Sequence, residues 1–233
     1  MQSSEQYWVV IPATGTGQRM QASCPKQYLE LCGKSILLHT LDNLLSHPQI
    51  TGAVLVLNST DEYWEKLNYQ HTKPLLFCTG GEHRQHSVFN GLKKLQQLTG
   101  DNPYVLIHDA VRPFVSHSDL DRLIDALQKC DDGALLGVPV ADTLKYADDS
   151  QHVKSTHPRE NLWRAFTPQA FRLDKIFLAL NHAIANNLNI TDDASAMELM
   201  GAYPCLVQGD GDNIKITTPQ DLLLAEKLLY VNN

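Results

Sequence analysis

The sequence predicts an α/β protein built on a doubly wound, mostly parallel β-sheet, and two observations support this prediction. Short apolar runs rich in β-branched residues alternate along the chain with longer segments of helical periodicity. The apolar runs are nearly continuous, as expected for strands that are buried on both faces. Parallel strands are joined by helical crossovers, so this alternation favours helices on both sides of one sheet.

The elements are expected in the following order along the chain. Strands are predicted at the apolar runs 7–11, 52–57, 74–78, 104–108 and 133–140, and a short one near 204–207. Helical patterns, some opened by Ser or Asp, predict helices at 35–45, 82–98, 116–130, 173–187 and 192–201, and one from Pro219. Such sheets bind ligands beyond the carboxyl ends of their strands, so the loops that follow strands should carry the function.

One segment does not fit this alternation. Residues 141–165 are polar with only scattered apolar positions, and they are too long for an ordinary connection. We expect them to form an extended arm that reaches over the site or over a neighbouring subunit. The rest of the chain can form a single domain, so the expected organisation is one domain over 1–233 with the arm inside it.

Composition restricts the class of protein. The 233 residues are 43% hydrophobic, enough for a sizeable core, and the net charge of −7 argues against a nucleic-acid or membrane-surface binder. The N-terminus lacks a signal-peptide pattern and no run of about 18 apolar residues occurs, so a cytoplasmic protein is expected. The five cysteines are scattered without a CxxC pair, which predicts reduced thiols.

The loop after the first strand is basic in an otherwise acidic chain. The segment IPATGTGQRMQASCPKQYL contains Gly15 and Gly17, which would let backbone N–H groups face an anion, and Arg19 and Lys26 add positive charge. The GK[ST] of a Walker A loop is absent, and no third glycine completes a GxGxxG motif. A bound polyphosphate is therefore the hypothesis, and solvated surface charge is the alternative for Arg19 and Lys26.

Two further loops follow predicted strands. In HDAVRP, Asp109 is placed either to bind Mg²⁺ or to cap the next helix, and Arg112 either contacts a substrate or braces the loop. His108 is expected to be a hydrogen-bonded core residue. In TGGEHRQHSV, a Gly-Gly turn before a helix could read the edge of a base, with Ser87 and Arg84 nearby, or could be only a turn.

Polar residues in the arm and in the last third of the chain complete the candidates. Thr143 and Arg159 lie in the expected arm. Thr191 could cap the following helix, whose N-terminus is also a possible anion site. In GDGDNIKITTPQDL, Asp212 could supply a second carboxylate for Mg²⁺, and Lys215 could reach a substrate phosphate or protect an edge strand.

The sequence resembles the 2-C-methyl-D-erythritol 4-phosphate cytidylyltransferases of the non-mevalonate isoprenoid pathway. The likeness covers essentially the whole chain and rests on PATGTGQRM…PKQY, GGEHRQHSV, VLIHDAVRP, ADTLK, LWRAFTPQAF, TDDASAMEL and DNIKITTPQDL. It implies a Rossmann-like nucleotidyltransferase fold, a homodimer joined through a β-arm, and Mg²⁺ or another divalent cation. It also implies transfer of CMP from CTP to the methylerythritol phosphate, giving 4-diphosphocytidyl-2-C-methyl-D-erythritol and pyrophosphate.

The resemblance also implies roles for residues of this chain. The catalytic cations would be Arg19, Lys26, Arg159 and Lys215. The nucleotide would lie against Pro12, Ala13, Thr14, Gly15, Thr16, Gly17, Gly81, Glu82, Ser87, Asp109 and Ala110. The acceptor would contact Arg112, Thr143, Arg159, Thr191 and Lys215, and of these Thr143 and Arg159 would come from the partner's arm. The metal would be bound by Asp109 and Asp212.

Two positions depart from the family pattern, and other functions stay open. Thr14 stands where Ala or Gly is usual, and Glu82 where Asp is usual, and neither is one of the proposed catalytic side chains. A ribitol 5-phosphate cytidylyltransferase and a CTP-binding module without catalysis are the alternatives. Sugar-1-phosphate nucleotidyltransferases fit less well because of HDAVRP and DNIKIT, and a dinucleotide-dependent oxidoreductase lacks its third glycine.

Overall fold

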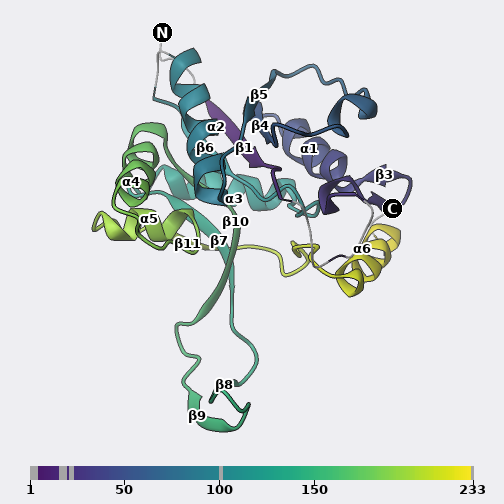
Figure 1. Ribbon diagram of the computed structural model, residues 1–233. Coiled ribbons are helices and arrows are strands. Elements are labelled where there is room, and N and C mark those ends of the chain that lie inside the picture. The colour runs from purple at the N-terminus through teal and green to yellow at the C-terminus, as the bar shows by residue number, and fades with distance from the viewer. Residues whose placement is uncertain (1–4, 16–19, 21–23, 100–101, 232–233) are drawn as a thin grey trace.

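A computed structural model describes residues 5–15, 20, 24–99 and 102–231 of the chain. Its centre is a seven-stranded mixed sheet with helices on both faces (Figure 1). The strands lie in the order β11 (Cys205–Gln208), β7 (Ala134–Pro139), β10 (Trp163–Arg172), β6 (Tyr104–Ile107), β1 (Tyr7–Pro12), β4 (Ile50–Leu57), β5 (Leu75–Thr79). All neighbours are parallel except β10, which is antiparallel to both β6 and β7. The predicted mostly parallel, doubly wound sheet is confirmed.

Helices cover the two faces of the sheet and bury it. One face carries α1 (Ile36–Ser46) and α3 (His117–Leu127). The other carries α2 (Arg84–Leu98), α4 (Leu173–Ala185) and α5 (Asp193–Leu199). Burial on both faces is the reason why the central strands are continuously apolar. In the described part of the chain, no helix is long and apolar enough to cross a membrane.

A smaller cluster of apolar side chains lies beside the main sheet. It joins α6 (Pro219–Val231) to the hairpin of β2 (Glu30–Leu31) and β3 (Lys34–Ser35). Two short 3-10 helices, η2 (Lys26–Tyr28) and η3 (Trp64–Leu67), lie in the connections. As predicted, α6 begins at its proline, whose fixed φ and missing N–H suit the first turn of a helix.

The N-caps agree with the sequence at two helices and differ at a third. Ser35 accepts a hydrogen bond from the backbone of the first turn of α1, and Ser116 does the same for α3. At α5 the cap is Asp192 and not Thr191, because the Asp192 carboxylate accepts from the N–H of Ser195 and the Ser195 side chain closes a capping box. The prediction that Thr191 caps this helix is therefore wrong.

The strand β10 is the largest difference from the sequence prediction. Residues 163–172 carry no predicted strand, and a proline inside a run argues against a central strand. The sheet accommodates Pro168 through a shift of register between Phe166 and Gln169. The run NIKI, considered as an edge strand, forms no strand in the described structure.

The arm protrudes from the body of the molecule, as Figure 1 shows at its lower end. It carries a hairpin of β8 (Leu144–Ala147) and β9 (Val153–His157), which among the described strands pair only with each other. The arm is shorter than the predicted 141–165, since β10 begins at Trp163 and joins the main sheet. Thus a β-hairpin arm is present at the expected place, and only its last residues belong to the body.

The cysteines are not all reduced. Cys130, which follows α3, and Cys205, the first residue of β11, form a disulfide across 75 residues of sequence. The prediction of reduced thiols is wrong for this pair and agrees with Cys24, Cys32 and Cys78. Two cysteines so far apart in the sequence and not in a CxxC motif meet only because β11 pairs with β7 at the edge of the sheet.

Candidate active site

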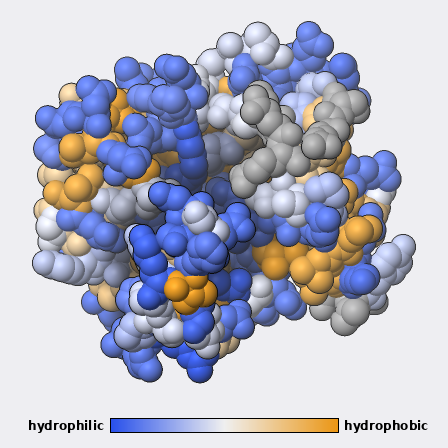
Figure 2. All heavy atoms as spheres, turned by 60° about the horizontal axis from the view of Figure 1, so that its bottom comes forward, coloured by the Kyte–Doolittle hydropathy of each residue, from blue (hydrophilic) through white to orange (hydrophobic). Residues whose placement is uncertain are grey.

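A cavity of about 450 Å³ opens where β1, β4, β5 and β6 end. Its lining consists of Pro12, Ala13, Thr14, Gly15, Lys26, Gln27, Asn58, Gly81, Glu82, Arg84, Asp109, Ala110, Val111 and Lys215. Figure 2 shows a hollow in the middle of one face with many hydrophilic residues around it, and the cavity lining combines charged side chains with apolar ones such as Ala13, Ala110 and Val111. The carboxyl ends of parallel strands are the expected place for a ligand. Most residues assigned to the nucleotide from the sequence therefore lie in one cavity.

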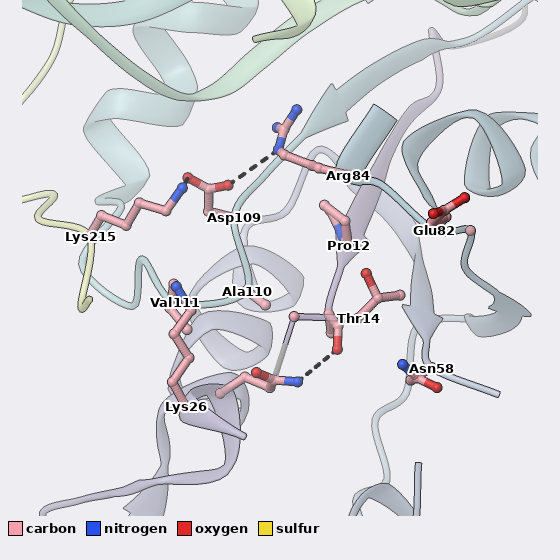
Figure 3. Close-up of a pocket in the computed structure, with 14 residues that line it drawn as sticks. Pro12, Thr14, Lys26, Asn58, Glu82, Arg84, Asp109, Ala110, Val111 and Lys215 are labelled. Carbon is pink, nitrogen blue, oxygen red and sulfur yellow. Dashed lines mark hydrogen bonds and ion pairs between the residues drawn. The ribbon is translucent and has the colours of Figure 1, made fainter. Parts of the chain in front are cut away.

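Asp109 is at the centre of the charged part of this cavity. Lys215 Nζ lies 2.9 Å and Arg112 Nε 3.1 Å from its Oδ2. Arg84 Nε lies 3.7 Å from Oδ1 and approaches from the side opposite Lys215 (Figure 3). Three cations therefore surround this carboxylate, and because Arg84 also pairs with the buried Asp193, the group keeps one net positive charge in an acidic protein.

The cations keep Asp109 ionised. Burial would raise the pKa of its carboxyl, but the charges of Lys215, Arg84 and Arg112 outweigh burial and hold that pKa well below its usual range. The neighbouring His108 is buried, and burial lowers its pKa to about 4. Its Nε2 donates to the carbonyl oxygen of Arg112 at 3.0 Å. His108 is thus a neutral core residue, as the sequence predicted.

Arg84 connects the cavity to a buried carboxylate beneath it. Its Nη1 and Nη2 donate to the two carboxylate oxygens of Asp193, at 3.0 and 2.7 Å. Asp193 is fully buried at the start of α5. Burial lowers the pKa of Arg84, but Asp193 and Asp109 outweigh that effect and raise it, so the guanidinium stays charged. The sequence predicts only that Arg84 lies near the bound nucleobase. Its pairing with Asp193 is not predicted, because the two residues are 109 positions apart.

Strand β10 supports the charged centre from behind. The N–H of Asp109 donates to Thr167 Oγ1 at 3.0 Å, and Asn213 Nδ2 donates to the Thr167 carbonyl at 2.9 Å. Arg112 Nη1 donates to the carbonyl of Asn213 at 2.7 Å. The loop that carries Lys215 is therefore tied to the Asp109 loop by both side chains and backbone. Arg112 acts here as a brace, one of the two roles predicted for it.

The basic loop after β1 is only partly described. Its start is held by Gln27, whose Nε2 donates to the carbonyl of Ala13 at 2.7 Å. Lys26 begins η2 directly after Pro25 and lines the cavity. Thr16, Gly17 and Arg19, which were also assigned to this site, lie outside the described residues.

The side of the cavity assigned to the base differs in detail from the prediction. Gly81 and Glu82 line it, but Ser87 is fully buried behind it and is not part of the lining. The hydroxyl of Thr14 lies 3.1 Å from that of Ser87, so it contacts this buried group.

Four other predicted residues are not brought to the cavity within this chain. Asp212 is exposed and does not line it, and its backbone N–H donates to Asp210 Oδ1 at 2.9 Å. Thr143 and Arg159 are exposed on the arm, and Arg159 donates to the carbonyl of Ala141. Thr191 lines a neighbouring cavity of about 600 Å³ that shares Glu82 and Arg84 with the first. These four assignments stay predictions.

The residues present fit a site for one Mg²⁺ ion. Mg²⁺ is commonly held by one or two carboxylates together with substrate phosphates. Oδ1 of Asp109 faces Arg84 at a distance too long for a direct hydrogen bond, so it can turn a lone pair toward a metal. Among the described residues, no group of three or more His, Cys, Asp or Glu side chains could hold a metal by itself. The arrangement suits a metal that arrives with a polyphosphate.

Sequence comparisons find relatives along almost the whole chain. Residues 7–231 match the family model described as IspD, 2-C-methyl-D-erythritol 4-phosphate cytidylyltransferase. A protein of that description from Stenotrophomonas maltophilia is 47% identical over 215 residues, which cover 92% of this chain and 93% of the relative. One from Colwellia psychrerythraea is 43% identical over 240 residues, covering 100% and 97%.

Solved structures with similar folds carry the same description. The Francisella tularensis 2-C-methyl-D-erythritol 4-phosphate cytidylyltransferase superposes with a TM-score of 0.82 at 34% identity, covering 95% of this chain and 99% of that one. The Thermus thermophilus protein superposes with a TM-score of 0.80 at 31% identity, covering 97% and 99%. Sheet order, including the antiparallel β10, is thus part of a fold shared along almost the whole chain.

Proposed function

Because this chain belongs to the IspD family and transfers CMP from CTP to 2-C-methyl-D-erythritol 4-phosphate, we propose that the transfer takes place in the cavity around Asp109. The observation that carries this placement is the group of three cations around one buried, ionised carboxylate at the ends of the parallel strands. A reaction between two polyanions needs such a local positive charge, whatever the net charge of the chain.

The reaction asks the protein for positioning and charge neutralisation. A phosphate oxygen of the acceptor attacks the α-phosphorus of CTP, the bond to the β-phosphate breaks, and pyrophosphate leaves. We assign Lys26, together with Arg19, to the α-phosphate, where negative charge develops in the transition state. Lys26 lines the cavity at the start of η2, which supports this role.

The nucleotide is assigned to the loops that follow β1, β5 and β6. Backbone groups of Pro12 to Gly15, continuing into Thr16 and Gly17, would face the phosphates. Gly81 and Glu82 would contact the cytosine, with Ser87 supporting them from behind. Ala110 would lie beside the ribose, since it lines the cavity next to Asp109.

Asp109 is the residue we assign to a divalent metal, Mg²⁺ by preference. When bound, the metal would neutralise phosphate charge and orient the triphosphate. The chain's own contribution is to keep Asp109 ionised and fixed, through Lys215, Arg112 and the Thr167 hydroxyl. Asp212 stays part of the proposal as a second ligand, although its exposed position requires the nucleotide to bring it closer.

The acceptor site is proposed to form between two subunits. Arg112, Thr191 and Lys215 would come from one subunit, and Thr143 and Arg159 from the arm of the other. The arm supports this, because Tyr146 and Val153 on its hairpin are 65% and 63% exposed, and apolar groups left in solvent often mark an interface. The functional unit would then be a homodimer of single nucleotidyltransferase domains spanning 1–233, each with its arm at 141–165.

We place the enzyme in the cytoplasm, where CTP is available. The disulfide between Cys130 and Cys205 is unusual for that compartment and is the observation that argues against it.

The proposal is tested by measuring pyrophosphate release from CTP with Mg²⁺ present or chelated. Methylerythritol 4-phosphate and ribitol 5-phosphate serve as parallel acceptors. We expect turnover with the first acceptor alone, and loss of turnover without the metal. Full turnover in the presence of a chelator would contradict the proposal that Asp109 binds a catalytic metal. Turnover with ribitol 5-phosphate would show that the acceptor site is less specific than proposed.

A further inference from the structure

The two loops assigned to the nucleotide are joined by a hydrogen bond between side chains. Thr14 Oγ1, in the loop after β1, lies 3.1 Å from Ser87 Oγ, in the first turn of α2. Thr14 lines the cavity, whereas Ser87 is fully buried behind it. This contact therefore connects the phosphate side of the cavity to the base side across 73 residues of sequence.

Ser87 also makes hydrogen bonds to the turn that precedes α2. Ser87 Oγ accepts from the N–H of Gly81 at 3.2 Å, and it lies 3.3 Å from the carbonyl oxygen of His83 and 3.4 Å from that of Gly81. A hydroxyl has one proton to donate and can accept twice. The Thr14 hydroxyl is thus one of the hydrogen-bond partners of Ser87, and either hydroxyl can be the donor between them.

The methyl group of Thr14 contacts the same turn. A Cβ atom built on Gly80 would lie 2.2 Å from Thr14 Cγ2 and 2.7 Å from Ser87 Oγ, so only a glycine fits there. The N–H of Gly80 in turn donates to the carbonyl of Leu57 at 2.8 Å. The turn before α2 is therefore held from three directions, by β4, by Ser87 and by Thr14.

We propose that Thr14 is a positioning residue that fixes the Gly80–Glu82 turn in the conformation that recognises cytosine. This inference rests on the proposed placement of CTP. Backbone groups of a short turn can distinguish cytosine from uracil only if their direction is fixed, because a site built to hydrogen-bond one base then leaves the other unpaired. The Thr14–Ser87 hydrogen bond does not change during the chemical step. We therefore expect it to stabilise the bound substrate and the transition state equally.

The test uses three variants that separate the hydroxyl from the methyl group. Thr14→Val keeps the shape and removes the hydroxyl, Thr14→Ser keeps the hydroxyl, and Thr14→Ala removes both. Steady-state kinetics with CTP and with UTP give kcat and KM for each. For Thr14→Val we expect KM for CTP to rise about fivefold, as for one hydrogen bond, with kcat within about twofold and a smaller preference for CTP over UTP. Thr14→Ser should restore that preference.

Two results would overturn the inference. One is a Thr14→Val enzyme with unchanged KM and unchanged preference. The other is a Thr14→Ser enzyme as impaired as Thr14→Val, which would assign the effect to packing. A Thr14→Val, Ser87→Ala double variant should be no worse than Ser87→Ala alone, because the two hydroxyls act as a pair. Lys26→Ala separates a failure of this inference from a failure of the proposed CTP site. If CTP were bound elsewhere, Lys26→Ala would also leave kcat and KM unchanged.

Discussion

The charged centre around Asp109 and the β8–β9 arm differ in how their cations are held. In the centre, Arg84, Arg112 and Lys215 contact buried or nearly buried carboxylates. On the arm, every residue from 151 to 160 is exposed, and the Arg159 guanidinium donates to a carbonyl of the same arm. The nucleotide half of the site is thus assembled within one chain, whereas the arm presents its cation to something outside it.

This difference has an energetic cause. A buried charge is costly unless it is paired, so removing one partner in the centre should be felt by the whole fold. An exposed charge costs little and stabilises little until another surface covers it. Substitutions in the centre should therefore change folding, and substitutions on the arm should change activity alone.

The largest expected effect is at Asp193. Asp193→Ala removes the buried partner of Arg84, and we expect the free energy of unfolding to fall by about 3 kcal/mol, the lower end for a broken buried pair. We use the lower end of the range for broken buried ion pairs because 35% of the Arg84 side chain is exposed, and because Asp109 remains as a second partner of Arg84. Chemical denaturation measures the change, with the exposed Asp142→Ala as the matched control. Equal stability of the two variants would contradict a paired centre.

Lys26 should give the next largest effect. Lys26→Ala is expected to lower kcat at saturating substrates by at least about 10²-fold, since loss of one transition-state contact costs roughly 2.7 kcal/mol or more. The exposed Lys93→Ala on α2, which does not line the cavity, is the control. A change confined to KM would exclude Lys26 from stabilising the transition state.

His108 should make folding sensitive to acid. Burial lowers its pKa from 6.5 to about 4, so the unfolded chain binds a proton that the folded one does not. Stability from this residue is complete above about pH 6.5 and is lost as the pH falls toward 4, which amounts to about 2 kcal/mol between pH 7.5 and 5.

Thermal or chemical unfolding of His108→Gln across this pH range tests the expectation. Glutamine can still donate to the Arg112 carbonyl but does not titrate. His39 and His47, whose pKa burial also lowers, are present in both proteins and cancel in the difference. Parallel pH profiles for the two proteins would show that His108 does not carry this dependence.

The smallest effect on folding is expected at Arg159. Arg159→Ala should change the free energy of unfolding by less than about 0.5 kcal/mol, as usual for an exposed residue, yet it should impair turnover. If the arm acts on the partner, mixing this variant with Lys26→Ala restores one intact site in each heterodimer, about a quarter of wild-type activity after random exchange. Heterodimers without any activity would place Arg159 outside the partner's site.

Local features of the fold and site were predictable from the sequence. The continuous apolar runs predict buried parallel strands, and those strands direct attention to the loops that carry Lys26 and Asp109. Lys215, proposed from a motif in a separate loop, does meet Asp109. In each case the signal lies within a few neighbouring residues, because strand burial and helix capping are decided by local spacing.

Pairs of residues distant in the sequence were decided only by the tertiary structure. Arg84 with Asp193, Thr14 with Ser87 and Cys130 with Cys205 are each separated by more than 70 residues. The sequence does not predict strand β10, because a central proline normally opposes a strand, and only the neighbours of β10 in the sheet show how a register shift accommodates the proline. The sequence by itself determined which segments fold locally and which loops are chemically unusual. The packing of the sheet decided which distant charges and hydroxyls meet, because such pairs form only when burial forces each polar group to find a partner.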